Sequence, residues 1–479
     1  MGRPIRFLLD GEVRELADVD PTLTVLNLLR YDLRRTGTKE GCAEGDCGAC
    51  TVVLAELEGD RVRFRAVNAC ILFAPMLDGR ALFTVESLAR DGGLHPIQQA
   101  MVATHGSQCG FCTPGIVMSL YAHQREGADA ASLKDALAGN LCRCTGYGPI
   151  LAAGQAMGDD IDIDDIPDLA AALKAIRPTE PLDLRHGAGR YLAPRTLAHF
   201  AEAVARRPHA TILAGGTDVG LWVTKQHRAL PDIISIHEVA ELRHIENLGH
   251  AVRIGAGVRY ADAHGALADL HPQFGDLLRR LGGLQVRNLG TVCGNIANGS
   301  PIGDMPPALI AAGATLVLRQ GETTRTLPLE AYFLAYGKQD RRPGEFVEAV
   351  IVPRIPPDRV FKIYKLSKRF DQDISAVCAG ISIALKDDRV IDARLAFGGM
   401  AATPKRAGAC EAALIGQPWA PEAVRAAAEA LAQDFQPIDD MRASAAYRLQ
   451  VAKNLLLRAV LETTEDLAPL REIEALAHG

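Results

Sequence analysis

Residues 39–50 read KEGCAEGDCGAC, and a further cysteine follows at position 70. The first cysteine set therefore consists of Cys42, Cys47, Cys50 and Cys70. The spacing C-x4-C-x2-C with one distant cysteine is the plant-type ferredoxin pattern for a 2Fe–2S cluster. The glycines of the loop allow the backbone to wrap a small cluster closely. A zinc site competes with this interpretation, but short zinc spacings usually come in separate pairs, so the stretch favours a ferredoxin-like domain.

A second cysteine set consists of Cys109 and Cys112, in QCGFC, and of Cys142 and Cys144, in CRC. A C-x2-C pair combined with a C-x-C pair is not the common zinc pattern. The spacing alone therefore favours iron–sulfur chemistry and leaves zinc as an alternative. Helix-period stretches follow the first pair and precede the second. We expect this set to lie between helix ends, where N-terminal N–H groups stabilise negative charge.

The composition limits the class of protein. The chain has 479 residues, of which 48% are hydrophobic and 23% charged. This length suggests about three domains, and the apolar content argues against extended disorder. The net charge of −6 argues against a broadly basic nucleic-acid binder. The longest weakly apolar stretch, 306–318, is shorter than the roughly 20 residues that span a bilayer, and the first residues lack a signal-peptide core. We expect a cytoplasmic chain that binds neither nucleic acid nor a membrane.

Three of the eleven cysteines, Cys293, Cys378 and Cys410, lie outside the two sets. Free cysteines usually behave as small buried apolar residues, and none of the three has a cysteine partner nearby in the sequence. We therefore expect no chemistry from them.

Hydrophobic patterns suggest the order of modules along the chain. Hairpins are predicted over 5–16, around Asp10-Gly11, and over 51–67. Thr24 is expected to begin a helix, and residues 96–156 have a helical pattern. Six aspartates within 158–168, followed by prolines, indicate a linker.

A mixed α/β region with three glycine-rich loops follows, at 214–218, 255–257 and 287–304. Such loops let backbone N–H groups approach a pyrophosphate. None completes the G-x-G-x-x-G fingerprint, and most glycine-rich turns are only turns, so flavin or nucleotide binding is one of two open interpretations. Two strands joined by a charged turn over 361–385, and a helix over 445–461, are expected near the end.

The motifs resemble a known family. The stretches at 39–50, QCGFCTPG at 108–115 and NLCRCTGY at 140–147 resemble the iron–sulfur portion of the xanthine dehydrogenase and molybdenum hydroxylase family. LAGGTDVG at 213–220 and TVCGNIANGSPIGDMPP at 291–307 resemble the flavin domain of that family. KLSKRFDQDIS at 365–375 and DDMRASAAYR at 439–448 resemble its flavoprotein C-terminal domain.

The resemblance implies a multidomain α+β fold. The expected modules, in chain order, are a plant-type ferredoxin-like β-grasp 2Fe–2S domain (1–76), a helical-bundle 2Fe–2S domain (77–157), an acidic and proline-containing linker (158–190), an α/β FAD-binding domain of the PCMH or vanillyl-alcohol-oxidase type (191–360) and an α+β C-terminal flavoprotein domain (361–479).

The resemblance also implies roles for residues. Each cysteine set would hold one 2Fe–2S cluster, the second set nearer the molybdenum and the first nearer the flavin. Gln108 matches a glutamine that contacts the pterin, and Lys365 matches a lysine near the flavin, with Val347 as a packing neighbour. A surface charge is the other interpretation of Lys365. Ile254 stands where animal members carry an aromatic residue, a departure that concerns stacking on the flavin. The remaining FAD contacts would be Ile212, Leu213, Ala214, Gly215, Gly216, Thr217, Asp218, Val219, Thr291, Asn295, Ser300 and Asp304.

The implied activity needs a second chain. Members with everything on one polypeptide continue into a molybdopterin portion, so this chain resembles the small subunit of a split, bacterial-type member. The substrate, hypoxanthine or xanthine, would be hydroxylated to urate at a molybdopterin centre on a large partner subunit, in a heterotetramer with two copies of each. Electrons would pass through the two clusters to FAD and then to NAD+, and no substrate-binding catalytic residue is expected on this chain.

Three other functions stay open from the sequence. The chain could be a free-standing iron–sulfur flavin reductase, or the electron-transfer subunit of another molybdenum hydroxylase that oxidises an aldehyde or another N-heterocycle. It could also be a non-catalytic chain in which the cysteines hold structural zinc.

Overall fold

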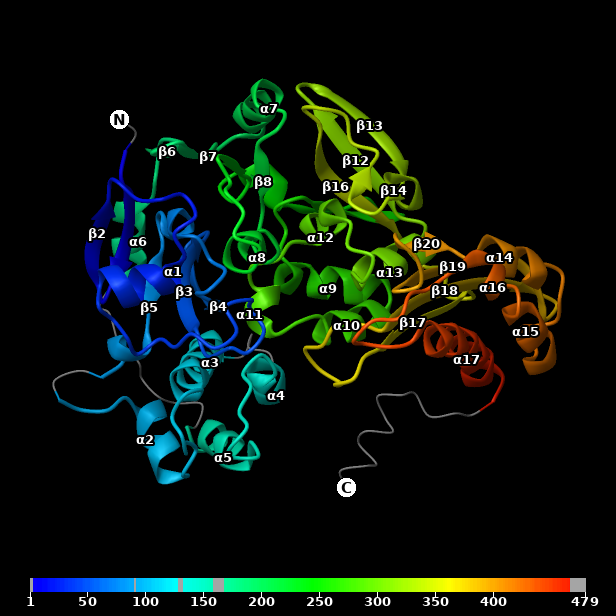
Figure 1. The fold of residues 1–479 in the computed structure, drawn as a ribbon, viewed down its shortest axis with the longest axis horizontal. Coiled ribbons are helices and arrows are strands. Elements are labelled where there is room, and N and C mark those ends of the chain that lie inside the picture. Colours follow the sequence, from blue (N-terminus) through cyan, green and yellow to red (C-terminus); the bar gives the residue numbers. More distant parts are fainter. Residues whose placement is uncertain (1–2, 90–91, 128–131, 158–167, 466–479) are drawn as a thin grey trace. The chain divides into compact units, whose positions relative to one another are not determined.

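The computed structural model describes residues 3–89, 92–127, 132–157 and 168–465, which form two compact units (Figure 1). Unit 1 consists of Met1–Leu242, Arg259–Asp262 and Gly282–Thr291. Unit 2 consists of Arg243–Val258, Ala263–Leu281 and Val292–Gly479. Sheets and helices occur in both units, and the expected multidomain α+β fold is confirmed. Over the described ranges, no helix combines the length and apolar character needed to cross a bilayer.

The first sheet of unit 1 has the strand order β2-β1-β5-β3-β4. Its strands are β1 (Ile5–Leu9), β2 (Glu12–Leu16), β3 (Thr51–Glu58), β4 (Arg61–Asn68) and β5 (Ala81–Phe83). Both predicted hairpins are present, and β5 joins them by pairing parallel with β1 and antiparallel with β3. Because neighbouring side chains of a strand point to opposite faces, Val52 and Leu54 enter one core and Val53 and Ala55 another.

The two faces of this sheet have different covers. One core contains the short helix α1 (Val25–Asn27), the π-helical turn η1 (Leu28–Asp32) and the 3-10 turn η2 (Ala74–Leu77). Thr24 caps α1 as predicted, through its side chain and the N–H of Asn27. The other core contains the helices of the second cysteine set and α6 (Leu169–Ile176).

The helices of the second set follow η3 (Val85–Ser87) and are α2 (Pro96–Ala103), α3 (Thr113–Glu126), α4 (Leu133–Leu137) and α5 (Gly148–Ala156). Helix α3 packs against β3 and β4 (Figure 1). Helix α6 lies in the segment 158–190, predicted as a linker, and its Leu169, Leu173 and Ile176 are buried in the same core as α3. Part of that segment is therefore folded, whereas the acidic positions 158–167 lie outside the described residues.

The second sheet of unit 1 has the order β6-β7-β9-β8. Its elements are β6 (Leu182–His186), β7 (Gly189–Ala193), α7 (Leu197–Arg206), β8 (Thr211–Leu213), α8 (Val219–Thr224), β9 (Asp232–Ser235), η5 (Ala240–Arg243) and, later in the chain, α11 (Leu284–Arg287). Strand β8 pairs parallel with β9, so its carboxyl end delivers the chain into the glycine-rich loop 214–218.

The first sheet of unit 2 has the order β10-β11-β16-β12-β13, and β14 and β15 form a separate hairpin. These elements are β10 (Ile245–Asn247), β11 (Ala251–Gly255), β12 (Thr315–Gln320), β13 (Thr323–Pro328), η6 (Leu329–Tyr332), β14 (Phe333–Ala335), β15 (Lys338–Gln339) and β16 (Phe346–Pro353). The helices near them in sequence are α9 (Tyr260–Leu270), whose first residues belong to unit 1, α10 (Pro272–Arg279) and α12 (Val292–Asn298).

The second sheet of unit 2 is an antiparallel meander of four strands (Figure 1). Its strands are β17 (Val360–Leu366), β18 (Val377–Lys386), β19 (Arg389–Gly398) and β20 (Lys405–Arg406), and its helices are α13 (Met305–Ala312), α14 (Gly408–Leu414), α15 (Pro421–Ala428), α16 (Leu431–Asp434) and α17 (Ala445–Thr464). Ala379 and Ile381 of β18 enter the core shared with α14–α17. Gly380 faces α13 instead, since an added Cβ would lie 2.5 Å from the carbonyl oxygen of Pro307. The sheet is therefore covered on both faces.

Candidate iron–sulfur and flavin sites

The first cysteine set lies in unit 1, in the loop between η1 and β3 and at the end of β4. Cys50 and Cys70 are buried, and Cys42 and Cys47 are partly exposed. The loop directs backbone N–H groups of Glu44, Asp46 and Cys47 to the Sγ of Cys42, at 3.5, 3.3 and 3.3 Å. N–H groups aimed at a sulfur stabilise its anionic form, which is the form that binds a metal.

The sulfurs of this set also contact one another. The contacts of Cys42 with the thiols of Cys47 and Cys70 lower the pKa of Cys42. The hydrogen bond with Cys42 raises the pKa of Cys47, and contacts with Cys42 and Cys50 raise the pKa of Cys70. Space for these sulfurs depends on glycine, because a Cβ on Gly41 would lie 2.7 Å from the Sγ of Cys47. The geometry fits the proposed ligand set.

The second cysteine set is also in unit 1 and lies beside helix ends, as expected. Cys112 directly precedes α3, and Cys142 follows α4 by a few residues. Burial, followed by the contact with Cys142, raises the pKa of Cys112 to about 12. Burial acts to raise the pKa of Cys142 but is outweighed by hydrogen bonds with Thr145, and this pKa is lowered. Cys109 and Cys144 contact each other and are exposed.

No three Cys, His, Asp or Glu side chains among the described residues already have metal-coordinating geometry. The assignment of iron to both sets therefore depends on their spacing, on the sulfur–sulfur contacts and on the N–H groups aimed at Cys42. Gln108, the proposed pterin contact, is exposed next to Cys109.

A direct hydrogen bond connects the two sets. The N–H of Leu141, the residue before Cys142, donates to the carbonyl oxygen of Cys47 at 3.0 Å. The Nδ2 of Asn140 donates to the carbonyl oxygen of Gly48 at 3.1 Å, and the Nε2 of Gln285 donates to the Oδ1 of Asn140 at 2.9 Å. No sequence motif pointed to Gln285, which lies in α11 and is 145 residues away from Asn140.

The first predicted flavin loop, 212–219, lies in unit 1 between β8 and α8. Gly216 has φ +73°, a left-handed conformation that favours glycine. A Cβ on Gly215 would lie 1.9 Å from the carbonyl oxygen of Leu289, and a Cβ on Gly216 would lie 3.5 Å from the carbonyl oxygen of Ile71. The loop therefore packs against the residue that follows Cys70. Thr291 is buried in the same unit, and its neighbour Gly290 would bring an added Cβ within 3.2 Å of the Oγ1 of Thr217.

The other predicted flavin residues lie in unit 2. Lys365 is buried in β17 rather than a surface charge, and its Nζ donates to the Oδ2 of Asp304 at 2.5 Å. The Oγ of Ser375 donates to the other carboxylate oxygen of Asp304 at 2.5 Å. Ser300 lies in the loop before Asp304, where its Oγ accepts from the N–H of Ile302 at 3.4 Å.

Three further residues of unit 2 bear on flavin binding. The Oδ1 of Asn295 is buried and has no hydrogen-bond partner among the described residues, and an unmade buried hydrogen bond is costly. This oxygen is available to a hydroxyl donor of the kind that a ribityl chain supplies, which fits the predicted role. Val347 lies in β16, in a different sheet from Lys365. Ile254 is fully buried in β11.

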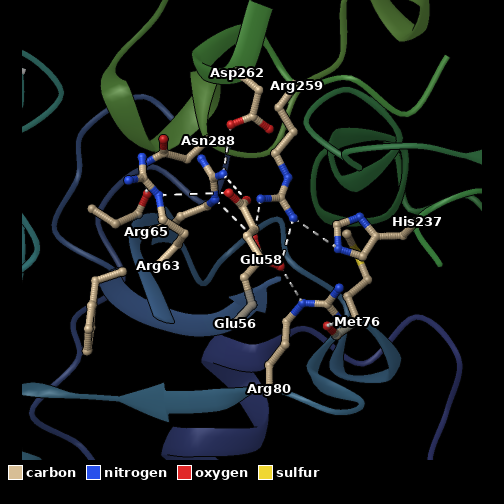
Figure 2. Close-up of polar contacts among 12 residues, drawn as sticks. Glu56, Glu58, Arg63, Arg65, Met76, Arg80, His237, Arg259, Asp262 and Asn288 are labelled. Carbon is tan, nitrogen blue, oxygen red and sulfur yellow. Dashed lines mark hydrogen bonds and ion pairs between the residues drawn. The ribbon is translucent and has the colours of Figure 1, made fainter. Parts of the chain in front are cut away.

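One charged cluster of unit 1 is invisible to motif analysis. Glu56 of β3 is surrounded by Arg65, Arg80 and Arg259, as Figure 2 shows. The sequence offered no signal for it, because an isolated Glu in a strand has no recognisable pattern and Arg259 is 203 residues away.

Four family models of known domains match the chain. The "2Fe-2S iron-sulfur cluster binding domain" matches residues 7–75 and a second 2Fe–2S binding domain matches 84–155. The "FAD binding domain in molybdopterin dehydrogenase" matches 185–355, and the "CO dehydrogenase flavoprotein C-terminal domain" matches 362–463.

Curated proteins and solved structures agree with these domains. Xanthine dehydrogenase of Drosophila subobscura is 32% identical over 532 residues, an alignment that covers 96% of this chain and 39% of that protein. Xanthine dehydrogenase of Oryza sativa subsp. japonica is 32% identical over 86% of this chain and 36% of that protein. The chain thus spans less than half the length of these relatives.

A solved chain of carbon monoxide dehydrogenase from Hydrogenophaga pseudoflava is 28% identical with a TM-score of 0.53, covering 56% of this chain and 95% of that one. With two 2Fe–2S domains, an FAD-binding domain and the flavoprotein C-terminal domain in this order, the chain belongs to the molybdenum hydroxylase family as an iron–sulfur and FAD chain.

Proposed function

We propose that this chain carries electrons from a molybdopterin-containing partner subunit through two 2Fe–2S clusters to FAD. The observation that carries the proposal is the continuity of three elements within unit 1. The second cysteine set is joined to the first by the hydrogen bond from Leu141 to Cys47. The first set is joined to the flavin loop through Ile71, the residue after Cys70, whose carbonyl oxygen would lie 3.5 Å from a Cβ on Gly216.

When bound, each 2Fe–2S cluster exchanges single electrons and FAD accepts either one or two. The protein supplies the holding groups. Cys42, Cys47, Cys50 and Cys70 are the proposed ligands nearer the flavin, and Cys109, Cys112, Cys142 and Cys144 are the proposed ligands nearer the partner. The exposure of Cys109 and Cys144 supports the second assignment, because a group that receives electrons from another chain must lie near the surface. The exposed Gln108 would meet the pterin there.

For the flavin, the proposed contacts are loop 212–219 and Thr291 of unit 1, with Asn295, Ser300, Asp304, Val347 and Lys365 of unit 2. In unit 1 the backbone N–H groups of the glycine-rich loop would hold the diphosphate. In unit 2 the buried Oδ1 of Asn295 would accept a hydroxyl hydrogen bond, and the Lys365–Asp304 pair would provide a fixed charge. The domain boundaries 1–76, 77–157, 191–360 and 361–479 belong to the same proposal.

The substrate and acceptor are proposed from the relatives. Because the 32% identical proteins are xanthine dehydrogenases, we propose hypoxanthine and xanthine as substrates of the complex, urate as its product and NAD+ as the acceptor. The partner would be a large subunit that binds molybdopterin, and the assembly would contain two copies of each chain.

The test is to purify the chain from its own host under mild conditions. We expect visible absorption of iron–sulfur clusters and flavin, a co-purifying molybdenum-containing chain, and loss of the visible bands on anaerobic addition of xanthine. Recovery of the bands on adding NAD+ would identify the acceptor.

Other outcomes would assign other functions. Bleaching by an aldehyde or by another N-heterocycle, but not by xanthine, would change the substrate class. A coloured chain without a molybdenum-containing partner would indicate a free-standing reductase. A colourless chain that contains zinc would contradict electron transfer altogether.

A further inference from the structure

Glu56 is the centre of a buried charge cluster in unit 1 (Figure 2). Its Oε1 accepts from the Nε of Arg65 at 2.9 Å and from the Nη1 of Arg259. Its Oε2 accepts from the Nε of Arg80 at 3.1 Å and from the Nη2 of Arg259 at 2.9 Å. Arg259 thus binds the carboxylate through two parallel hydrogen bonds, a geometry that fixes the orientation of the guanidinium relative to the carboxylate.

All four side chains are removed from water. Glu56 is 6% exposed, Arg65 6%, Arg80 5% and Arg259 5%. Burial alone would raise the pKa of Glu56, but the charges of Arg259, Arg80 and Arg65 hold it well below the usual range. A cavity of about 10 Å³ beside the cluster has room for about one water. Glu56 and the arginines therefore pair with one another, and they do not form a binding site for a larger ligand.

Arg259 connects Glu56 to the part of the flavin domain that belongs to unit 1. Residue 259 forms a β-bridge with Thr291, and the N–H of Tyr260 donates to the carbonyl oxygen of Gly290 at 2.9 Å. The Nδ2 of Asn288 reaches the carbonyl oxygen of Ala66, in β4, at 2.9 Å. The segment 288–291 also packs against the glycine-rich loop 214–218. The carboxylate of Glu56 therefore holds this segment against the ferredoxin-like sheet.

Arg80 connects the same carboxylate to the segment that carries Cys70. Its Nη1 donates to the carbonyl oxygens of Met76 and Asp78, both at 3.0 Å, and these residues follow Cys70 along η2. A Cβ on Gly216 of the flavin loop would lie 3.5 Å from the carbonyl oxygen of Ile71, so this loop packs against the residue after Cys70. The carboxylate of Glu56 thus accepts hydrogen bonds from two arginines. Arg80 holds the segment that follows Cys70, and Arg259 holds segment 288–291, which packs against the flavin loop.

We propose that Glu56 is a positioning residue for electron transfer between the first cluster and FAD, because it sets how Cys70 and Ile71 lie against the flavin-binding loop. The inference rests on the proposed electron-transfer function. For each electron that FAD gains, one electron leaves a reduced cluster, and two such transfers with two protons from solvent reduce FAD fully.

A purely stabilising role explains the cluster less well. Replacing a buried ion-pair network by apolar side chains is often neutral or stabilising, so charge is a poor device for stability alone. Directional bonds from three arginines to two oxygens instead fix the relative orientation of strand, loop and helix. The experiment must therefore separate orientation from stability.

The main variant is Glu56→Gln in the full chain with both cofactors bound. A flash-generated one-electron donor reduces the clusters, and the absorbance of FAD follows the transfer. We expect the rate to fall severalfold, because electron transfer slows as the distance between donor and acceptor grows, while iron and FAD contents and the cluster spectrum stay normal. The matched control is Glu58→Gln, on the same face of β3, since Glu58 also pairs with Arg65 but its side chain is 43% exposed. We expect the control to transfer electrons at the unchanged rate.

A second variant, Arg259→Lys, keeps the charge and the folded core but removes the two-bond grip on Glu56. We expect the same slowing, together with faster amide hydrogen exchange at 288–291, as a readout independent of electron transfer. Normal rates in both variants at full cofactor content would overturn the inference, and so would failure of both to accumulate as folded protein, since the network would then be required for folding itself. A wild-type chain without iron or FAD would instead contradict the proposed function.

Discussion

Lys365 shows how strongly one buried residue can depend on its partner. Its side chain is 2% exposed and that of Asp304 is 9% exposed. Lys365→Met would leave the carboxylate buried, with the Oγ of Ser375 as its remaining side-chain donor among the described residues. We expect unit 2 to lose about 3–5 kcal/mol of unfolding free energy, the cost of breaking a buried ion pair, as measured by urea denaturation. Lys368→Met is the control, because Lys368 donates to the carbonyl oxygen of Met441 at an exposed position. Equal midpoints for the two variants would contradict the prediction.

His237 predicts a pH dependence of stability. The pKa of His237 lies well below its usual range because of burial and the positive charges of Arg80 and Arg259, against which Glu238 and Glu56 act. The unfolded chain takes up a proton on this ring below about pH 6.5, whereas the folded chain does so only at lower pH. The unfolding free energy must therefore fall as the pH decreases below about 6.5, by up to about 1.4 kcal/mol per pH unit from this group.

The measurement compares urea midpoints of the wild type and of His237→Gln between about pH 7 and 5. A glutamine can still accept a hydrogen bond from Arg259, and it does not titrate. We expect the variant to lose less stability than the wild type over this range. Parallel curves would show that His237 is protonated equally in the folded and unfolded chains.

At the scale of elements, the start of α3 lies against the loop of the first cysteine set. A Cβ on Gly115 would be 2.1 Å from the carbonyl oxygen of Gly48 and 3.2 Å from the Cα of Ala49. These are backbone atoms of the loop between Cys47 and Cys50, which cannot move aside without moving the cysteines. We therefore expect Gly115→Ala to destabilise unit 1 by about 1–3 kcal/mol, although alanine normally favours a helix.

The control for this variant is Gly148→Ala at the first residue of α5, where an added Cβ meets no atom of the described residues within 4 Å. Reduced entropy of the unfolded chain predicts a neutral or slightly stabilising effect there. Thermal unfolding and the visible absorption of the clusters measure both variants. A Gly115→Ala chain with wild-type stability and iron content would show that helix and loop can separate.

Sequence patterns predicted the elements that interactions between nearby residues stabilise. The hairpins at 5–16 and 51–67 follow from alternation and turn residues, and the structure has them as β1–β2 and β3–β4. The helix expected after Thr24 is only three residues long before it widens into the π-helical turn η1. Helix α6 was not predicted, because acidic and proline residues flank it in the sequence. The burial of Leu169, Leu173 and Ile176 in the same core as α3 stabilises it. Such tertiary contacts are not encoded in a local window.

At the scale of the whole molecule, the cysteine sets could be predicted from the sequence, whereas the charge cluster around Glu56 could not. Three of the first four cysteines fall within nine residues, and their spacing carries the chemistry by itself. The cluster around Glu56 joins β3 and β4 with residues about 200 positions later, so only the folded chain brings its charges together. The Oδ1 of Asn295 is likewise informative only because it is buried and no described residue forms a hydrogen bond with it. Sequence motifs thus indicate which groups the chain would hold, and the fold indicates how they are held.

The whole chain should lose one cluster without losing the rest of its electron path. Cys142→Ser removes a proposed ligand of the second set, and we expect iron to fall from about four to about two atoms per chain. FAD should remain bound, because the flavin loop packs against Ile71, the residue after Cys70, and the substitution lies in the other cysteine set. Cys293→Ser is the control, since Cys293 is fully buried and lies outside both cysteine sets. In the complex with its partner, substrate should no longer bleach the flavin of Cys142→Ser, whereas direct chemical reduction still should. Unchanged iron content, or normal bleaching by substrate, would remove the second set from the path, because electrons would then reach FAD without it.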